Sequence, residues 1–183
     1  GIMPADYPVT AFSLTGYSGG GKKMIAAYEG EKTTDLLAPR QYGLGQTHKH
    51  LPEIVTICHL ADKPLFSPIV DDYYSGMEVT VPVFTKLLKG TPGIQSVWEA
   101  LAAHYEGCDF IHVRPLGEDK GGFLAANDIS GRDDMEIFVT GNDQRILLTS
   151  VFDNLGKGAS GAAIQNMNIM LGIDPKTGLN LGE

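Results

Sequence analysis

Two histidines stand two residues apart in the segment THKHLPEI, at positions 48 and 50. In an extended segment the side chains at i and i+2 point to the same side, so His48 and His50 can share one site. Glu53 follows at the start of an expected helix. A neighbouring carboxylate can tune the pKa of an imidazole, ordinarily about 6.5, for general acid–base work. The pair is therefore a candidate catalytic site.

Two other interpretations of this pair stay open. The histidines can be purely structural, because well-placed histidines mark functional sites only in some proteins. A metal site would take His48, His50 and Glu53, with His59 as a further ligand. His59 lies off the apolar face of the expected helix, however, and no fourth ligand has a suitable spacing. We therefore predict no metal site.

A second candidate is the glycine-rich stretch TGYSGGGKKM. From Gly16 it reads G-x-x-x-x-G-K and then Lys23, where a P-loop needs a hydroxyl to hold Mg²⁺. Lys23 cannot supply that hydroxyl, so a P-loop is not favoured. Residues 18–21 still open a short helix, and free N–H groups at a helix start can bind an anion. Ser18 and Gly19 are candidate ligand contacts, and a tight turn without a ligand is the alternative.

The third candidate is the segment FDNLGKGASGAAIQNMN. Asp153 and Asn154 follow an apolar strand, Lys157 is flanked by glycines, and small residues from Gly158 onward open a helix. Each glycine costs a helix about 1 kcal/mol relative to alanine. Something must therefore approach this backbone closely. Another helix and a cofactor are the two candidates.

The order of expected elements indicates an α+β fold. Apolar periodicity predicts helices over residues 21–28, 51–61, 93–105 and 158–171, the last capped by Gly172. The strands expected are 9–16, two joined around Ser75 and Gly76, and then 110–113, 121–130, 134–141 and 144–154. Consecutive strands joined by short turns are antiparallel neighbours. We expect a mixed, mostly antiparallel sheet with helices on one face.

Composition narrows the classes of protein. The chain has 183 residues, 43% of them hydrophobic, which suits one domain. A net charge of −8 without a basic stripe disfavours nucleic acid, and the apolar runs are too short to span a membrane. The two cysteines do not form a disulfide framework, and no export signal opens the chain. A cytoplasmic location is expected.

The chain resembles the C-terminal domain of N-acetyl-γ-glutamyl-phosphate reductase, an arginine-biosynthesis family. Four segments carry the resemblance: TGYSGGGKKM, THKHLPEI, GRDDMEIFVTGN and DNLGKGASGAAIQNMNIMLG. It implies a glyceraldehyde-3-phosphate-dehydrogenase-like C-terminal domain that supplies substrate contacts and the interface of a homodimer or homotetramer. It also implies a second domain that binds NADP, and a cysteine that forms a thioester while N-acetyl-glutamyl 5-phosphate is reduced to N-acetylglutamate semialdehyde.

The resemblance also suggests roles for individual residues. Ser18, Gly19 and His50 would contact the small-molecule substrate, and His48 or His50 would serve as the acid–base group. Asn154, Lys157 and Gly158 would reach the nicotinamide side of NADP. Residues 1–183 would form a single substrate-binding and dimerisation domain, with residues 153–172 as a terminal helix that contacts the NADP-binding domain.

The chain departs from the family pattern at the nucleophile. The Gly-Cys-Tyr-Pro-Thr stretch that carries the family's cysteine does not occur in it, and neither does a dinucleotide-binding fingerprint. Cys58 is expected on the apolar stripe of its helix, as an inert structural thiol, and Cys108 matches no family position. We therefore expect a truncated catalytic and oligomerisation domain that is inactive alone. A stand-alone binding or dimerisation module without catalysis is the alternative.

Overall fold

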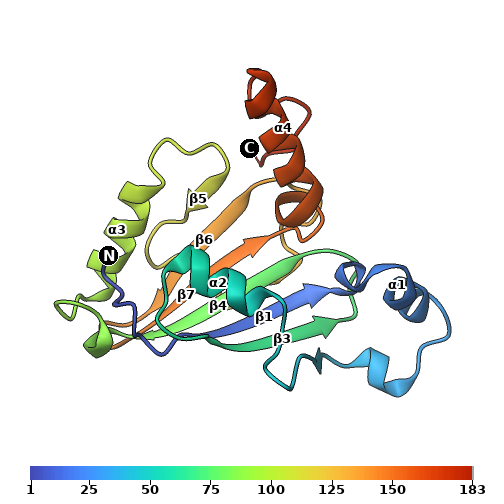
Figure 1. The fold of residues 1–183 in the computed structure, drawn as a ribbon, viewed down its shortest axis with the longest axis horizontal. Coiled ribbons are helices and arrows are strands. Elements are labelled where there is room, and N and C mark those ends of the chain that lie inside the picture. The colour runs from blue at the N-terminus through green and yellow to red at the C-terminus, as the bar shows by residue number, and fades with distance from the viewer. Residues whose placement is uncertain (183) are drawn as a thin grey trace.

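A single mixed sheet organises the molecule in the computed structural model, which describes residues 1–182 (Figure 1). Its seven strands lie in the order β2-β3-β1-β4-β7-β6-β5. Two pairs, β1 with β3 and β5 with β6, are parallel, and the other four are antiparallel. The strands are β1 Thr10–Gly16, β2 Arg40–Gln41, β3 Leu65–Asp71, β4 Met77–Phe84, β5 Ile111–Val113, β6 Met135–Gly141 and β7 Arg145–Phe152.

The four expected helices form close to their predicted bounds. They are α1 Gly21–Glu29, α2 His50–Cys58, α3 Ile94–His104 and α4 Gly161–Leu171, and a π-helical turn, Gly156–Ser160, leads into α4. Short 3₁₀ turns cover Tyr17–Gly20, Thr34–Leu37 and Thr85–Leu87. None of the helices within residues 1–182 is long and apolar enough to cross a membrane.

Helices α2 and α3 cover the same face of the sheet (Figure 1). Leu51 of α2 packs on Ala11 and Phe66 of the paired strands β1 and β3. Val97 of α3 belongs to a larger core cluster with these buried residues of the strands and loops: Tyr7, Val83, Leu88, Val139 and Ile146. The predicted α+β architecture with helices on one face is confirmed.

The opposite face of the sheet is only partly covered. At one end Ile129, from the loop 114–134, packs on Phe138 and Val151. Towards the other end, apolar side chains of four paired strands stay 40–55% exposed: Phe12, Leu65, Phe84 and Leu147. We call this set the open sheet face. Several exposed apolar side chains on one face of a sheet are typical of an interaction site.

Two expectations about the strands are wrong. Residues 121–130 form turns instead of a strand, with the glycines at 121 and 122 at positive φ. The connection from β5 to β6 is therefore long, and these strands pair in parallel instead of antiparallel. Strands β3 and β4 also do not pair with each other, because β1 lies between them.

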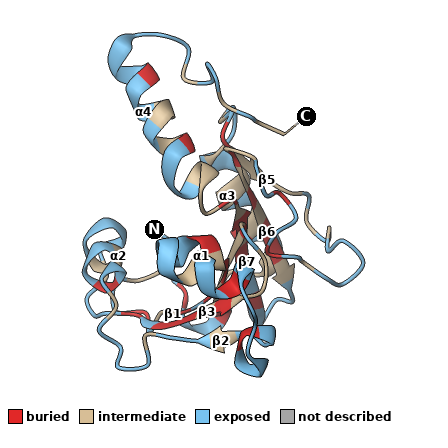
Figure 2. Ribbon diagram, turned by 90° about the vertical axis from the view of Figure 1, so that its right-hand side faces the viewer, coloured by how far each residue is buried: buried red, intermediate tan, exposed pale blue. Residues whose placement is uncertain are grey.

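The apolar stripes of two helices are less buried than expected. In α2 only Leu51 is buried, whereas Ile57 is 76% exposed and Cys58 is exposed, so the prediction of an inert buried thiol at Cys58 is wrong. Ile54 and Val55 are partly buried. Helix α4 stands out from the sheet (Figure 2), and its side chains Met167, Met170 and Leu171 are largely exposed.

Candidate active site

Three segments that lie far apart in the sequence line one cavity of about 290 Å³. Gly19 and Gly20 come from the turn after β1, His48 and His50 from the start of α2, and Asn154 from the end of β7. The apolar part of the wall consists of Met24, Phe66, Val70 and Met77, and the rest of Thr15, Gly16, Tyr42 and Lys49. The three motifs singled out in the sequence therefore meet at one place.

The turn after β1 is fixed by the neighbouring strand connection. A side chain at Gly16 would place its Cβ 2.5 Å from the carbonyl oxygen of Tyr74, so only glycine fits there. The N–H of Ser18 donates to that same carbonyl oxygen at 3.0 Å, and the N–H of Gly21 donates to the carbonyl oxygen of Ser18. The expectation of free N–H groups along residues 18–21 is therefore wrong for Ser18 and Gly21.

Asn154 connects this turn to the other end of the chain. Its Nδ2 donates to Ser18 Oγ at 3.0 Å, across 136 residues of sequence. Its Oδ1 accepts the N–H of Gly76 at 2.8 Å. Ser18 is buried, so its hydroxyl faces Asn154 inside the protein. The amide of Asn154 is thus held on both sides where it lines the cavity.

The two histidines lie side by side at the start of α2. The segment is helical instead of extended, since Lys49 has φ −57° and ψ −28°, yet both imidazoles line the cavity. Their ring centroids are 4.7 Å apart, and the ring of His48 packs edge-on to Phe66 at 5.1 Å. His50 donates its backbone N–H to His48 Nδ1 at 3.2 Å. Neutral His48 therefore carries its proton on Nε2.

The environment of His48 favours its neutral form. Partial burial lowers the pKa of His48 below its ordinary value, and the positive charges of His50 and Lys49 lower it further. Glu53 acts in the opposite direction but more weakly. His48 is therefore neutral at neutral pH and presents an N–H on Nε2.

Lys157 and Gly158 lie outside the cavity. Lys157 donates from Nζ to Gln165 Oε1 at 2.8 Å, and its Nζ lies 4.8 Å from the centroid of the Phe110 ring. Burial lowers the pKa of the Lys157 amine. The N–H of Gly158 donates to the carbonyl oxygen of Asp153 at 2.9 Å. Of the three residues predicted to meet the cofactor, only Asn154 lines the cavity.

The small residues around the π-helical turn have a different cause from either one expected. A side chain at Gly156 would collide with the carbonyl oxygen of Arg132, and one at Gly161 would collide with the carboxylate of Asp133. The object that approaches the backbone is the turn formed by residues 131–133, which is neither a helix nor a cofactor.

Sequence reasoning missed other residues of this site. Tyr42 lines the cavity, and burial raises the pKa of its phenol. Lys49 also lines it, although its position between the two histidines could have indicated this. For Gly76, which holds Asn154, the sequence predicts only a place in a turn. Tyr42 follows a two-residue strand, which leaves no periodic signal in the sequence.

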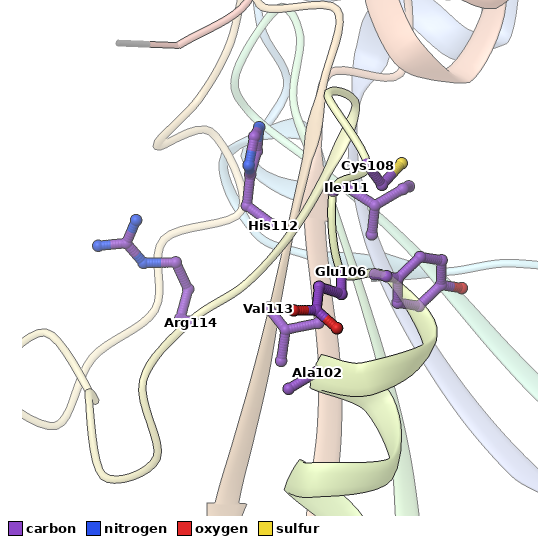
Figure 3. Close-up of a pocket in the computed structure, with 9 residues that line it drawn as sticks. Ala102, Glu106, Cys108, Ile111, His112, Val113 and Arg114 are labelled. Atoms are coloured by element: carbon purple, nitrogen blue, oxygen red, sulfur yellow. The ribbon is translucent and has the colours of Figure 1, made fainter.

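A second cavity, of about 400 Å³, lies between β5 and the end of α3 (Figure 3). Cys108 and His112 both line it, but their side chains point to opposite sides of the β5 segment. His112 Nε2 lies 3.0 Å from Oδ2 of the fully buried Asp134. Cys108 and His112 therefore do not make a nucleophile–base pair. Within residues 1–182 no group of three or more His, Cys, Asp or Glu side chains could hold a metal ion.

Comparison with known proteins agrees with this architecture. Residues 1–154 match the family described as semialdehyde dehydrogenase, dimerisation domain. The N-acetyl-gamma-glutamyl-phosphate reductase of Brucella anthropi is 46% identical over 177 residues, and that of Brucella ovis is 45% identical. Each alignment covers 94% of this chain and 57% of the relative. The chain thus spans little more than half the length of these relatives.

Similar folds occur among solved structures. Aspartate semialdehyde dehydrogenase II of Vibrio cholerae superposes with a TM-score of 0.65 at 18% identity, covering 89% of this chain and 54% of that one. The enzyme of Francisella tularensis gives a TM-score of 0.65 at 14% identity, covering 89% of this chain and 57% of that one. By the match over residues 1–154, the chain belongs to the family of semialdehyde dehydrogenase dimerisation domains.

Proposed function

We propose that this chain is the substrate-binding and dimerisation part of an NADPH-dependent reductase that converts N-acetyl-glutamyl 5-phosphate to N-acetylglutamate semialdehyde. One observation carries the proposal: the glycine turn, the histidine pair and Asn154 line a single cavity. The reductase names of the two Brucella relatives, at 45–46% identity, support the choice of substrate.

The alternative, a binding module without chemistry, predicts that the glycine turn and the histidines face different sides of the fold. Gly19, His48 and His50 instead line the same cavity, and Ser18 bonds to Asn154 beside them. Catalytic groups must lie within reach of one reacting centre, whereas a dimerisation module has no need of this convergence. The arrangement therefore favours the enzyme part.

Between the two histidines, the geometry favours His48 as the group that meets the substrate carbonyl. Its Nδ1 is occupied by the N–H of His50, so its Nε2–H is the group that faces the substrate. A neutral imidazole with a fixed tautomer can donate a hydrogen bond from Nε2–H to the oxyanion that forms at this carbonyl and stabilise it. His50, which is exposed and lines the same cavity, is the candidate contact for an anionic group of the substrate.

Bound NADPH would supply the hydride for this reduction. Asn154 fits a contact with the nicotinamide side, because its amide is fixed at the cavity by Gly76 and Ser18. Lys157 and Gly158 do not line this cavity, and Lys157 is turned onto Gln165 and Phe110. The role of this chain towards the cofactor therefore rests on Asn154.

The surface of α4 gives a place for the NADP-binding domain. Met167, Ile169, Met170 and Leu171 are 51–86% exposed on a helix that stands out from the sheet (Figure 2). Apolar side chains in such a number are usually covered by another body. The nucleotide-binding domain of the same reductase would cover them, and the nucleophilic cysteine would enter the cavity with it.

The open sheet face gives a place for a second copy of the chain. Phe12, Leu65, Phe84 and Leu147 lie on paired strands, opposite the helices. A two-fold axis through this face would bring the same apolar patch of both copies together. The family description as a dimerisation domain supports this homodimer.

Joining the chain to the part of the Brucella anthropi reductase that it does not match should give an active enzyme. We expect NADP-dependent oxidation of N-acetylglutamate semialdehyde in the presence of phosphate, measured by absorbance, and no turnover by the chain alone. His48→Asn should lower kcat by roughly 10²–10⁴-fold. The control is His59→Asn, at an exposed left-handed position outside the cavity that asparagine tolerates. A folded joined protein without turnover would refute the proposal.

His48 should titrate below the ordinary histidine value of 6.5 in an NMR titration of the chain. Because the unfolded chain then binds this proton more readily, the unfolding free energy should fall as pH decreases through about 6.5. The variant His48→Gln should lose that part of the pH dependence. A pKa of His48 at or above 6.5 would contradict the neutral form on which its role depends.

Leu147→Glu should convert a dimer of the chain into a monomer in sedimentation experiments. The charge would have to be buried in the interface without a partner, which costs several kcal/mol. Leu147 is 44% exposed in the single chain, so the monomer should keep its circular dichroism spectrum. Ile57→Glu, at a side chain that is 76% exposed on the other face, is the matched control and should stay dimeric. An unchanged dimer of Leu147→Glu would place the interface elsewhere.

A further inference from the structure

Asp153 is a nearly inaccessible carboxylate beside the cavity that the proposed chemistry leaves without a role. It is 2% exposed, and it precedes Asn154 directly. Its Oδ1 accepts the N–H groups of Leu155 at 2.6 Å and Gly156 at 2.9 Å. Its Oδ2 accepts Ser75 Oγ at 2.9 Å and the N–H of Gly131 at 2.5 Å. One side chain thus gathers donors from three separate segments.

These donors lie next to the residues that fix the position of Asn154. Ser75 is the neighbour of Gly76, whose N–H donates to Asn154 Oδ1 at 2.8 Å. Leu155 and Gly156 follow Asn154, so their bonds fix the backbone on its other side. Both the backbone of Asn154 and the donor to its side chain are therefore tied to the same carboxylate.

Further hydrogen bonds hold the turn that carries Gly131. Asn180 donates from Nδ2 to the carbonyl oxygen of Gly131 at 2.7 Å. The N–H of Asp133 donates to the carbonyl oxygen of Asn180 at 2.7 Å, and the N–H of Asn180 donates to Asp133 Oδ2 at 2.8 Å. The close packing of Gly156 and Gly161 against residues 132 and 133 joins the same turn to the base of α4. The frame around Asp153 is therefore built from several independent contacts.

The hydrogen bonds decide the charge of Asp153. Burial alone would raise its pKa, but the N–H groups of Gly131, Gly156 and Leu155 and the hydroxyl of Ser75 outweigh burial and lower it. The side chain stays ionised at neutral pH, and an ionised carboxylate accepts hydrogen bonds from all four donors. Asparagine has the same shape but would turn an NH₂ group towards some of these donors.

We infer that Asp153 is a positioning residue of the candidate site, whose carboxylate orients the amide of Asn154 between Gly76 and Ser18. Its effect on turnover rests on the proposed function, whereas its effect on the orientation of Asn154 does not. A misplacement of about 1 Å in a catalytic site can cost on the order of 100-fold in rate. The loss should appear mainly in kcat, since Asp153 itself lies behind the cavity wall.

The first test is an NMR comparison of the chain with its Asp153→Asn variant. In the original chain the side-chain NH₂ of Asn154 should show contacts to Ser18 and slow exchange with water. In the variant these signals should shift and exchange faster, while the core amides of Val83 and Ile146 keep their protection. Asp143→Asn is the matched control, because Asp143 also accepts a backbone N–H, that of Ile94 at 3.0 Å, away from the cavity.

The second test uses the same two variants in the joined reductase. Asp153→Asn should lower kcat by roughly 10–100-fold with KM for the semialdehyde little changed, and Asp143→Asn should turn over as the original. If the joined protein without substitutions is inactive, the proposed function fails, but the NMR comparison still decides the positioning role. If Asp153→Asn does not fold, Ser75→Ala replaces it, because it removes one donor and leaves the carboxylate in place.

Unchanged Asn154 signals in Asp153→Asn, or in Ser75→Ala where that variant replaces it, would overturn the inference. Equal losses in kcat from Asp153→Asn and Asp143→Asn would also overturn it, since they would reflect general destabilisation. A shift of the Asn154 signals confined to Asp153→Asn or Ser75→Ala, together with a loss confined to kcat, supports it.

Discussion

The hydrogen bond from Asn154 to Ser18 joins the two ends of the fold, and the candidate site depends on it. It forms because β1 and β7 end, and β4 begins, at the same end of the sheet. Thr15 of β1 pairs with Met77 of β4, and Met77 pairs with Phe152 of β7. The register therefore places the turn after β1, the start of β4 and the end of β7 side by side, although 136 residues separate Ser18 from Asn154. His48 and His50 line the same cavity, and Leu51 packs their helix on Ala11 of β1 and Phe66 of β3.

The two faces of the sheet differ in how they are covered. One face carries the helices and the apolar core, so it fixes the strands that form the cavity. The other face leaves Phe12, Phe84 and Leu147 exposed. Helix α4 begins seven residues after Asn154 and stands out from the sheet (Figure 1). The proposed substrate site, the proposed dimer interface and the exposed side of α4 are thus separate surfaces of one framework.

The sequence predicted the parts of the site better than their contacts. Residue types and spacing were sufficient to find the histidine pair, the glycine turn and Asn154, because each stands next to a recognisable element. The strand expected at 121–130 failed because Phe123, Leu124 and Ile129 imitate a strand pattern, while paired glycines bend the chain. The direction of Lys157 could not be predicted either, since it depends on Phe110 and Gln165, which meet it only in the folded chain. Long-range pairing and side-chain direction are set by tertiary packing.

A double-mutant cycle between Ser18 and Asn154 tests the central claim most directly. The unfolding free energies of the chain, of Ser18→Ala, of Asn154→Ala and of the double variant would be measured with urea. A direct hydrogen bond between a buried hydroxyl and a fixed amide predicts a coupling energy of about 1 kcal/mol. Additive effects, within about 0.3 kcal/mol, would mean that the two side chains do not meet and that the cavity does not exist as described.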